Sequence, residues 1–592
     1  MVDNAGTHLP IRTWRHSFLF LLGVSPGFFV LIIQQNTPEN CMKFSIIKIL
    51  TNDFPFKAHQ VKSQKGNSIV FNLLKKKLRQ KQAKSFQVEP TYPAYPVPLS
   101  QVEKAKVLGE LLGHSNDIIF RRFNLGFSST QVIAVFAEGL VDVNTQNESL
   151  FKPLMFYEQK EKNLDNARVY ESLKENYISV GEIAEFDDLF DASHSVLSGD
   201  TVLLMEGIKK VLTINTRSLP QRSIEEPKRE TIVRGPQEAF TELLRTNIAL
   251  LRRRLKHPDL VFETRRGGTY TYTEVAIVYL RGLASPKIVE EVRRRMERII
   301  HTDHVLESGM VEELIEDSPY SPFPQIEHTE RPDKAVAQLL EGRVIILIDG
   351  TPFTLIVPTL FWQFIQTADD YYERMMGSFV RVLRLIAFFV ALFLPSLYIA
   401  LTTYHQEMIP FSILVSINVA REGVPFPAFV EALIMEGIFE LLREAGIRIP
   451  AQIGQAVSIV GAIILGQAAI QAKLVSPAMV IIVAVTAISS FLIPAFNFAI
   501  ALRILRFGVM ILAATLGLFG ILVAAMFLLT HLVSLRSFGI PYMAPLAPLN
   551  LRELKDVFLR LPKWVADQRP SILKPLDKIR QKSGLKPQPN KD

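Results

Sequence analysis

Long apolar runs alternate with short charged segments over residues 385–533, and this alternation limits the possible folds of the chain more than any other feature. The first run, residues 385–401, has no charged side chain and approaches the roughly 20 residues that a membrane-spanning helix needs. Lipid offers no hydrogen-bond partners to the backbone, so such runs are expected to be helices. We therefore predict an α-helical transmembrane domain over residues 379–535. Its four predicted spans are residues 385–403, 452–471, 476–498 and 507–533.

Positive charge gathers beside the predicted membrane domain. The 592 residues carry a net charge of +8, and Arg381 and Arg384 lie at the start of the first span. Residues 536–592 form a basic tail. Because basic flanks usually stay on the cytoplasmic side, both regions are predicted to face the cytoplasm, which requires an even number of spans. Aromatic residues are not interleaved with the basic runs, so we expect lipid headgroups or solvent around them and no nucleic acid.

The sequence before the spans predicts two soluble units of mixed α/β (α+β or α/β) type. Short apolar runs bounded by turn residues predict strands within residues 99–219, and a second set predicts strands and helices within residues 228–358. In the second unit, Asp349 and Gly350 join two apolar runs, which favours a β-hairpin. Pro236 is expected to open a helix that continues to about Leu255.

The first 98 residues differ from the rest in composition. Residues 1–98 are basic and then rich in proline, which predicts a poorly structured region. Met42 is a second candidate start codon, in which case residues 1–41 would not belong to the protein. The single cysteine, Cys41, excludes an internal disulfide and any zinc site built from several cysteines.

Familiar catalytic patterns are scarce in this sequence. It contains no Gly-x-x-x-x-Gly-Lys, Gly-x-Gly-x-x-Gly or His-Glu-x-x-His motif. His301 and His304 flank Asp303 at a predicted helix end, where such a group is typical of a solvated turn. We therefore expect a protein that is not an enzyme and that has no cofactor and no metal site.

One segment within the membrane domain carries charge in a regular pattern. Residues 427–446 predict an amphipathic helix, because Pro427 can occupy its first turn and carboxylates recur among apolar residues. Glu436, Glu440 and Glu444 recur at every fourth residue and form one stripe, in which like charges repel. The stripe is either the wet face of an interfacial helix or the lining of a cation pathway. The residues assigned to the pathway are Glu431, Glu436, Glu440 and Glu444. Their candidate charge partners are Arg443, Arg503 and Arg506.

Small residues mark the second predicted span as a packing surface. Gly454, Gly461 and Gly466 would allow two helices to approach closely within lipid. These glycines are therefore predicted to support helix packing, within one chain or between copies of it.

Several long segments also resemble a known family. They include residues 244–254, 312–325, 341–353, 395–410 and 537–542. These segments resemble the A subunit of GerA-type spore germination receptors, and the resemblance covers about residues 99–552. The related stage V sporulation protein AF, an accessory of the spore's solute-release channel, shares the membrane region, so it stays as an alternative.

The resemblance implies a place in the inner membrane of a dormant spore, with the soluble domains and the tail facing the core. It implies a transporter-like B subunit and a C-subunit lipoprotein as partners, together with membrane lipid and further copies of the chain. It also implies that the chain forms or gates a cation pathway that starts germination. A scaffold that only anchors partners, or an unrecognised membrane-anchored enzyme, are alternatives of other classes.

Overall fold

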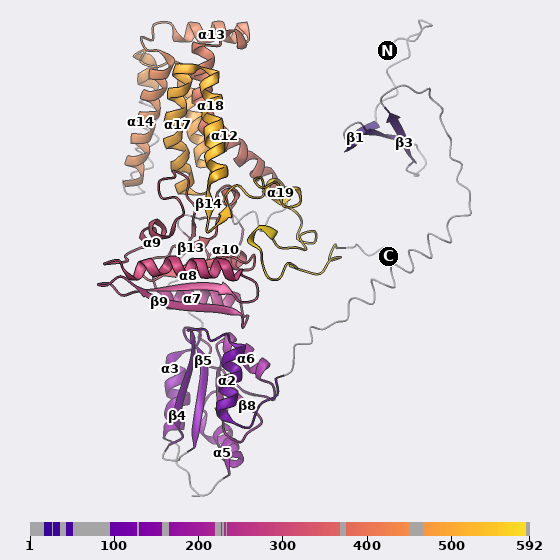
Figure 1. The fold of residues 1–592 in the computed structure, drawn as a ribbon, viewed down its shortest axis with the longest axis vertical. Helices are drawn as coiled ribbons and strands as arrows, with labels where there is room; N and C mark the ends of the chain where they lie inside the picture. The colour runs from indigo at the N-terminus through magenta and orange to yellow at the C-terminus, as the bar shows by residue number, and fades with distance from the viewer. Residues whose placement is uncertain are drawn as a thin grey trace, which may run out of the picture. The chain divides into compact units, whose positions relative to one another are not determined.

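The computed structural model describes most of the chain after residue 94 and the backbone of three strands before it. The ranges described after residue 94 are 95–126, 130–156, 165–218, 226–227, 230–232, 234–367, 375–448 and 466–587. The chain divides into two compact units, residues 1–92 and 93–592. Figure 1 shows the fold of each part.

The first unit contains an antiparallel sheet with the strand order β1-β2-β3. Its strands are β1 (Ser17–Ser25), β2 (Phe28–Gln35) and β3 (Lys43–Leu50). For these three segments, the prediction of a poorly structured region over residues 1–98 is corrected. Runs rich in Phe, Leu, Ile and Val favour strands, and pairing satisfies their backbone hydrogen-bonding groups.

Subdomain 1 (residues 95–218) is a five-stranded antiparallel sheet with the order β4-β5-β7-β8-β6. One face packs against α2 (Gln101–Leu111) and α6 (Leu189–Ser198), and shorter helical segments cover the other face. Both faces of the sheet are therefore buried. The strands are β4 (Ile118–Asn124), β5 (Gln131–Ala137), β6 (Ile183–Phe186), β7 (Thr201–Met205) and β8 (Val211–Ile214). The shorter helical segments are α3 (Val143–Thr145), η2 (Gln146–Phe151), α4 (Lys152–Met155), α5 (Asn166–Ser172) and η3 (Leu173–Tyr177).

Subdomain 2 (residues 234–367) has a second five-stranded antiparallel sheet, in the order β11-β13-β12-β10-β9. One face packs against α7 and α10, and the opposite face against α8 and α9. The strands are β9 (Leu260–Gly267), β10 (Thr273–Leu280), β11 (Glu327–Thr329), β12 (Val344–Ile348) and β13 (Thr354–Val357). The helices are α7 (Leu244–Arg254), α8 (Pro286–Ile300), α9 (Ser308–Ile315), α10 (Pro332–Leu339) and the 3-10 turn η4 (Phe361–Ile365).

The two subdomains correspond to the predicted units at residues 99–219 and 228–358. The predicted hairpin is present, since β12 pairs with β13 across the turn that contains Asp349 and Gly350. A buried ion pair joins the subdomains, with an Arg252 Nη2 to Asp117 Oδ1 distance of 2.9 Å. Both side chains are almost inaccessible to solvent, so the pair fixes the start of β4 against the end of α7.

The helix predicted to begin at Pro236 instead begins at Leu244. The carbonyl of Pro236 accepts a hydrogen bond from Arg331, and the backbone N–H of Phe240 donates to the carbonyl of Glu330. These bonds hold the segment before α7 in a non-helical conformation. The first N–H of the helix donates to the Asp349 carboxylate at 2.9 Å, so a distant turn sets the helix start.

The helical part (residues 375–534) follows subdomain 2. Figure 1 shows α12, α14, α17 and α18 running side by side. Two of the described helices are long and apolar enough to cross a membrane by length and composition, at Met376–Thr403 and Phe496–Leu516. The helices are α12 (Met375–Thr403), α13 (Phe411–Arg421), α14 (Ala428–Arg448), α16 (Pro477–Phe491), α17 (Phe496–Leu516) and α18 (Leu518–Ser534), with the 3-10 turn η5 (Gln406–Met408) after α12.

Two predicted spans have different bounds in the structure. The predicted span 476–498 contains α16 and the first residues of α17, because Pro494 lies in the turn between them and cannot continue a helix. The predicted span 507–533 is divided at Gly517, whose φ of +63° ends α17. A side chain there would also approach His405 within 2.8 Å. Most of the predicted span 452–471 lies outside the described residues, whereas the helix predicted at residues 427–446 corresponds to α14.

The predicted tail, residues 536–592, begins as folded structure. A two-stranded hairpin follows α18 directly, and a short amphipathic helix comes next. The elements are β14 (Arg536–Ser537), β15 (Ile540–Pro541), α19 (Leu551–Phe558) and the 3-10 turn η6 (Ser571–Leu573). Beyond α19 the chain returns to subdomain 2, where the backbone N–H of Leu576 donates to the carbonyl of Leu283 at 3.0 Å.

Candidate functional site

A buried ion pair connects three helices in the helical part. Arg506 of α17 donates through Nη1 to Glu436 of α14 at 2.6 Å, and each side chain is only 1% exposed. The Nε of the same arginine donates to the carbonyl of Ala391 on α12 at 2.6 Å. A charge pair away from water interacts strongly only when its geometry is good and its hydrogen bonds are satisfied. Arg506 therefore fixes α14 against both α12 and α17.

A second carboxylate on α14 receives two arginines. Glu440 accepts from Arg443, one turn further along the same helix, and from Arg503 of α17 at an Nη1 to Oε2 distance of 3.3 Å. Arg503 is buried, and its Nε also donates to the carbonyl of Ala499. The contacts of Glu440 thus repeat, one helical turn away, the link that Glu436 makes between α14 and α17.

Glu431, near the start of α14, joins two other elements. Its fully buried carboxylate accepts from Arg421 at the end of α13, at 3.1 Å, and from the backbone N–H of Ser476 at 2.8 Å. Ser476 is the N-cap of α16, and its hydroxyl accepts from the N–H of Met479. Glu431 therefore holds the ends of α13 and α16 together.

Glu444 differs from the other three carboxylates. It pairs at 2.6 Å with Arg448 of the same helix, and both side chains are more than half exposed. An exposed pair spaced by four residues contributes only a few tenths of a kcal/mol, roughly 0.3–0.5. Glu444 is thus the outward end of the stripe.

All four predicted carboxylates thus contact an arginine, and each of the three arginines named from the sequence contacts Glu436 or Glu440. Arg421 was not predicted as a partner, because its approach to Glu431 depends on how α13 folds back. Of the predicted packing glycines, Gly454 and Gly461 lie outside the described residues. A Cβ added at Gly466 would meet only Val480, at 4.0 Å, so the described structure shows no close helix approach there.

Two carboxylate oxygens on the stripe remain without a hydrogen-bond partner among the described residues. They are Oε1 of Glu436 and Oε1 of Glu440, and both atoms are buried. Glu436 therefore uses one oxygen for Arg506, Glu440 uses one oxygen for Arg443 and Arg503, and each keeps acceptor capacity on its other oxygen. Carboxylate oxygens are suitable ligands for small cations in an apolar surrounding.

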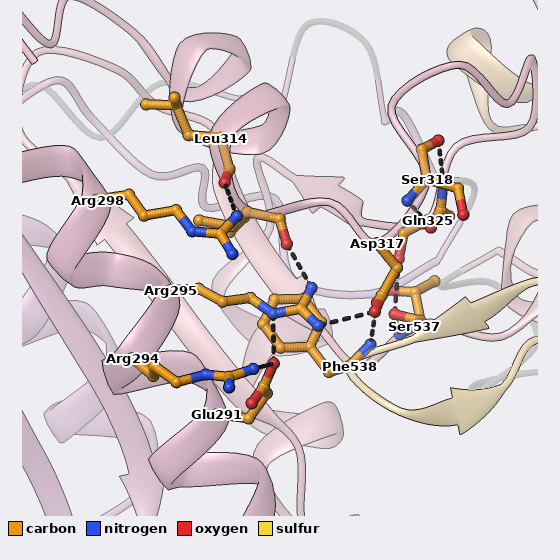
Figure 2. Close-up of polar contacts among 12 residues, drawn as sticks. Glu291, Arg294, Arg295, Arg298, Leu314, Asp317, Ser318, Gln325, Ser537 and Phe538 are labelled. Carbon is orange, nitrogen blue, oxygen red and sulfur yellow. Dashed lines mark hydrogen bonds and ion pairs between the residues drawn. The ribbon is translucent and has the colours of Figure 1, made fainter.

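A second polar cluster lies where subdomain 2 meets the hairpin after α18, and Figure 2 shows its contacts. Asp317 accepts from Arg295 of α8 at 2.8 Å and from the backbone N–H of Phe538 at 2.5 Å. The Arg295 guanidinium lies over the Phe538 ring, 4.2 Å from its centre, and also donates to Glu291. These contacts connect α8 with the turn between β14 and β15. We call this cluster the junction.

More hydrogen bonds reinforce the junction. The Ser537 hydroxyl donates to the carbonyl of Gln325 at 2.8 Å and accepts from the N–H of Thr359 at 3.0 Å. The buried Tyr542 hydroxyl donates to the carbonyl of Pro324 at 2.7 Å. Two segments that resemble the spore receptors, residues 312–325 and 537–542, therefore face each other here. The sequence showed both segments but not their contact.

Aromatic rings extend the junction into the helical part. Phe361, just after β13, packs edge to face against Phe388 of α12 and Phe498 of α17, with ring centres 5.6 and 5.4 Å apart. Its ring also lies 6.2 Å from that of Tyr542. Large buried rings of this kind stabilise contacts by burial and by edge-to-face geometry. Subdomain 2 is therefore packed directly against two helices.

Two carboxyl groups beside the junction have pKa values above the ordinary value of a glutamate. Burial, together with the nearby Glu316 and Glu307, raises the pKa of Glu312 to about 8. Burial also raises the pKa of Glu316 to about 7. The same cause raises the pKa of the Tyr542 hydroxyl well above its usual value. Near pH 7 the structure thus favours the neutral form of Glu312, whereas Glu316 is close to the midpoint of its titration.

In the parts of the chain that the structure describes, no group of three or more His, Cys, Asp or Glu side chains is placed to hold a metal ion. His304 instead contacts Asp303 at 2.7 Å at the partly exposed end of α8.

Comparison with known proteins decides the family. The profile described as Bacillus/Clostridium GerA spore germination protein matches residues 106–572. The chain belongs to the GerA spore germination family. The family predicted from the matching segments is thereby confirmed.

Two relatives match this GerA-family chain over most of their own length. Spore germination protein KA of Bacillus subtilis (strain 168) is 44% identical over 483 residues, which are 81% of this chain and 87% of that protein. Spore germination protein GerLA of Bacillus cereus is 40% identical over 476 residues, 80% and 96% of the two chains. The crystal structure of the N-terminal domain of the A subunit of the Bacillus megaterium spore germinant receptor GerK3 shares 36% identity. It covers 46% of this chain and 99% of that chain, with a TM-score of 0.36.

Proposed function

We propose that the chain is the A subunit of a nutrient germinant receptor in the spore inner membrane, and that its helical part forms or gates a cation pathway. Family membership supports the role in germination, and the two long apolar helices support a place in a membrane. The observation that carries the gating proposal is the set of buried ion pairs on α14. The role is non-enzymatic, and the soluble subdomains and the tail face the core.

The junction would transmit a movement of subdomain 2 to such a gate. Asp317 and Ser537 bind subdomain 2 to the hairpin that follows α18 without a linker. Phe361 contacts α12 and α17 directly. Any displacement of subdomain 2 therefore acts on the helices, and α17 carries the two arginines that hold α14. We propose that a signal received by the soluble part moves α17, and that α14 responds through these pairs.

The partners follow from the same proposal. A transporter-like B subunit and a lipoprotein C subunit would complete the receptor, and copies of the chain would assemble into an oligomer. Cross-linking of spore membranes followed by immunoblotting tests the assembly. A chain that cross-links neither to itself nor to such subunits would contradict it.

The decisive variant for the cation pathway is Glu440→Lys. It places a third cation beside Arg443 and Arg503, so it should abolish the release of monovalent cations from spores after nutrient addition. The measurement is cation flux from spores, with immunoblots for abundance. Because Glu444 is exposed and pairs only with Arg448 among the described residues, we leave it out of the proposed pathway, and Glu444→Lys on the same helix face is the matched control. Normal flux from Glu440→Lys spores at normal abundance would contradict the proposal.

A second experiment separates the receptor subunit from an accessory of the solute-release channel. Spores that lack the chain are exposed to separate panels of amino acids, sugars and nucleosides. A receptor subunit predicts loss of the response to particular nutrients and retention of the others. An accessory subunit predicts slower solute release with every nutrient. A scaffold that only anchors partners predicts no conductance from the reconstituted receptor.

A further inference from the structure

Helix α19 is fixed beside the first part of α12, as Figure 1 shows. The Arg381 guanidinium of α12 donates to the carbonyl of Asp556, and the backbone N–H of Arg560 donates to the Ser378 hydroxyl at 3.1 Å. The rings of Phe558 and Trp362 pack edge to face with centres 5.4 Å apart. The place of α19 along α12 is therefore determined by several independent contacts.

The part of α12 beside α19 is where its exposed apolar surface begins. Phe379 is 66% exposed and Ile386 is 53% exposed, and Arg381 and Arg384 occur in the same turns. In a helix that crosses a membrane, the last arginines before an uncharged apolar run mark the boundary between headgroups and hydrocarbon, and residues 385–401 carry no charge. This step rests on the proposed function, in which α12 spans the membrane. It places α19 at the level of the lipid headgroups.

Exposed side chains on and around α19 combine apolar and basic character. The exposed apolar side chains are Leu549, Leu551, Leu559 and Val565. The basic side chains of the same stretch are Arg552, Lys555, Arg560 and Lys563. Segments of this composition lie in the interface, because the apolar side chains enter the acyl boundary while the cations approach anionic headgroups.

A small hollow between η4, α12 and α19 is lined by Trp362, whose indole N–H is a hydrogen-bond donor. Trp362, Gln366, Arg381 and Phe558 are among the residues that line it. Trp362 is only 8% exposed, and its indole N–H has no acceptor among the described residues. A buried N–H without an acceptor is unfavourable, so a ligand oxygen that reaches this place would be favoured. Phosphate and ester oxygens of lipid headgroups provide such acceptors.

We propose that the corner formed by η4, the first turns of α12, and α19 binds anionic phospholipid headgroups. The consequence extends to subdomain 2, because Glu553 of α19 accepts from the N–H of Ser571 and the following chain reaches Leu283. Lipid bound at this corner would therefore hold subdomain 2 at a fixed distance from the bilayer surface.

A spin label placed on the full chain tests the proposal. Cys41 is the single cysteine, so Cys41→Ser gives a background into which Leu559→Cys introduces one label site. The protein is reconstituted in nanodiscs of phosphatidylcholine alone or with added phosphatidylglycerol. We expect the label at position 559 to meet oxygen more readily than a water-soluble nickel reagent, and the difference to grow with phosphatidylglycerol. Combined Arg552→Glu and Lys555→Glu substitutions should remove that growth.

Two control labels keep the outcomes distinct. Val102→Cys in subdomain 1, where the side chain is 65% exposed, should report water in both kinds of nanodisc. Ile386→Cys on α12 reports whether α12 itself lies in the bilayer, so nickel access there contradicts the proposed membrane span. With Ile386 in lipid, a label at position 559 that behaves like the Val102 control overturns the headgroup proposal. A label at position 559 that neither reagent reaches shows a protein partner instead and also overturns it.

Discussion

Arg506 shows how one buried charge can determine the packing of three helices. A guanidinium in an apolar interior needs a counter-ion and hydrogen-bond acceptors, and Arg506 finds both in Glu436 and the carbonyl of Ala391. Neither partner is close to Arg506 in sequence. The spacing of carboxylates on α14 nevertheless indicated that cations were needed nearby, because three like charges on one stripe repel one another.

Removing one partner of this pair should be more harmful than removing both. Arg506→Met leaves the Glu436 carboxylate buried without its hydrogen-bonded cation, at a cost of about 3–5 kcal/mol. We expect that variant to be scarce in membrane fractions. Combining Arg506→Met with Glu436→Leu removes both charges, and abundance should recover, because apolar replacements of a buried pair are often neutral. Immunoblots of membrane fractions measure this, and equal loss in the single and double variants would contradict it.

The raised pKa of Glu312 predicts a pH dependence of stability. The folded state keeps a proton on Glu312 up to about pH 8, whereas the unfolded chain releases it near the ordinary value of 4.5. The folded state therefore binds more protons over this range, and stability falls as pH rises from about 4.5 towards 8. Glu312→Gln mimics the neutral form, so it should raise the unfolding temperature at about pH 8 and flatten the pH dependence.

Thermal unfolding of the full chain in detergent, at about pH 6 and about pH 8, checks this prediction. The control is Glu313→Gln, because Glu313 lies on the same helix and is exposed. That variant should keep the pH dependence of the original protein. If Glu312→Gln behaves in the same way as the control, the neutral form of Glu312 does not contribute to folding.

At the scale of elements, local signals were predictable from the sequence and distant contacts were not. The β12–β13 hairpin follows from Asp349 and Gly350, which favour a tight turn wherever they stand between apolar runs. The start of α7 did not follow, because its N–H donates to Asp349, which is 105 residues away. The division between α17 and α18 was missed because Gly517 stands in an otherwise continuous apolar run. The stripe on α14 was predictable, but not its link to Arg421.

The junction predicts a variant that separates sensing from folding. Asp317→Ala removes the acceptor of the Phe538 N–H, whose loss costs about 1–3 kcal/mol at this contact. Arg295 keeps Glu291 and the carbonyl of Ile315, so subdomain 2 should remain folded. We expect normal abundance and a reduced nutrient-triggered cation release from spores.

The control for this variant is Asp303→Ala. Asp303 is 66% exposed in its side chain and contacts the adjacent His304. Its replacement should leave cation release unchanged. If Asp317→Ala spores release cations at the original rate while the protein is present, the junction does not transmit the signal.

At the scale of the whole second unit, subdomain 2 is attached to the helical part by two separate routes. One route is the junction at Asp317 and Phe538, together with the Phe361 ring that extends it to α12 and α17. The other is the chain after α19, where Leu573 is fully buried and Arg580 pairs with Glu341 at 3.1 Å. From composition, this stretch was predicted only to be a basic tail. Its contacts were not predictable, because the residues that it binds in subdomain 2 lie more than 200 positions earlier in the chain.

Truncation after Asp567 removes the second route and leaves the junction intact. Subdomain 2 should then be held less firmly, because the bonds from Arg569 to Leu340 and from Leu576 to Leu283 are lost. We expect faster hydrogen exchange in the segments around Leu283 and Leu340, and a weaker cation release from spores at similar abundance. Truncation after Leu585 is the matched control, since it keeps these contacts and should behave like the full chain. Exchange and cation release that are unchanged after truncation at Asp567 would show that the junction alone transmits motion between subdomain 2 and the helices.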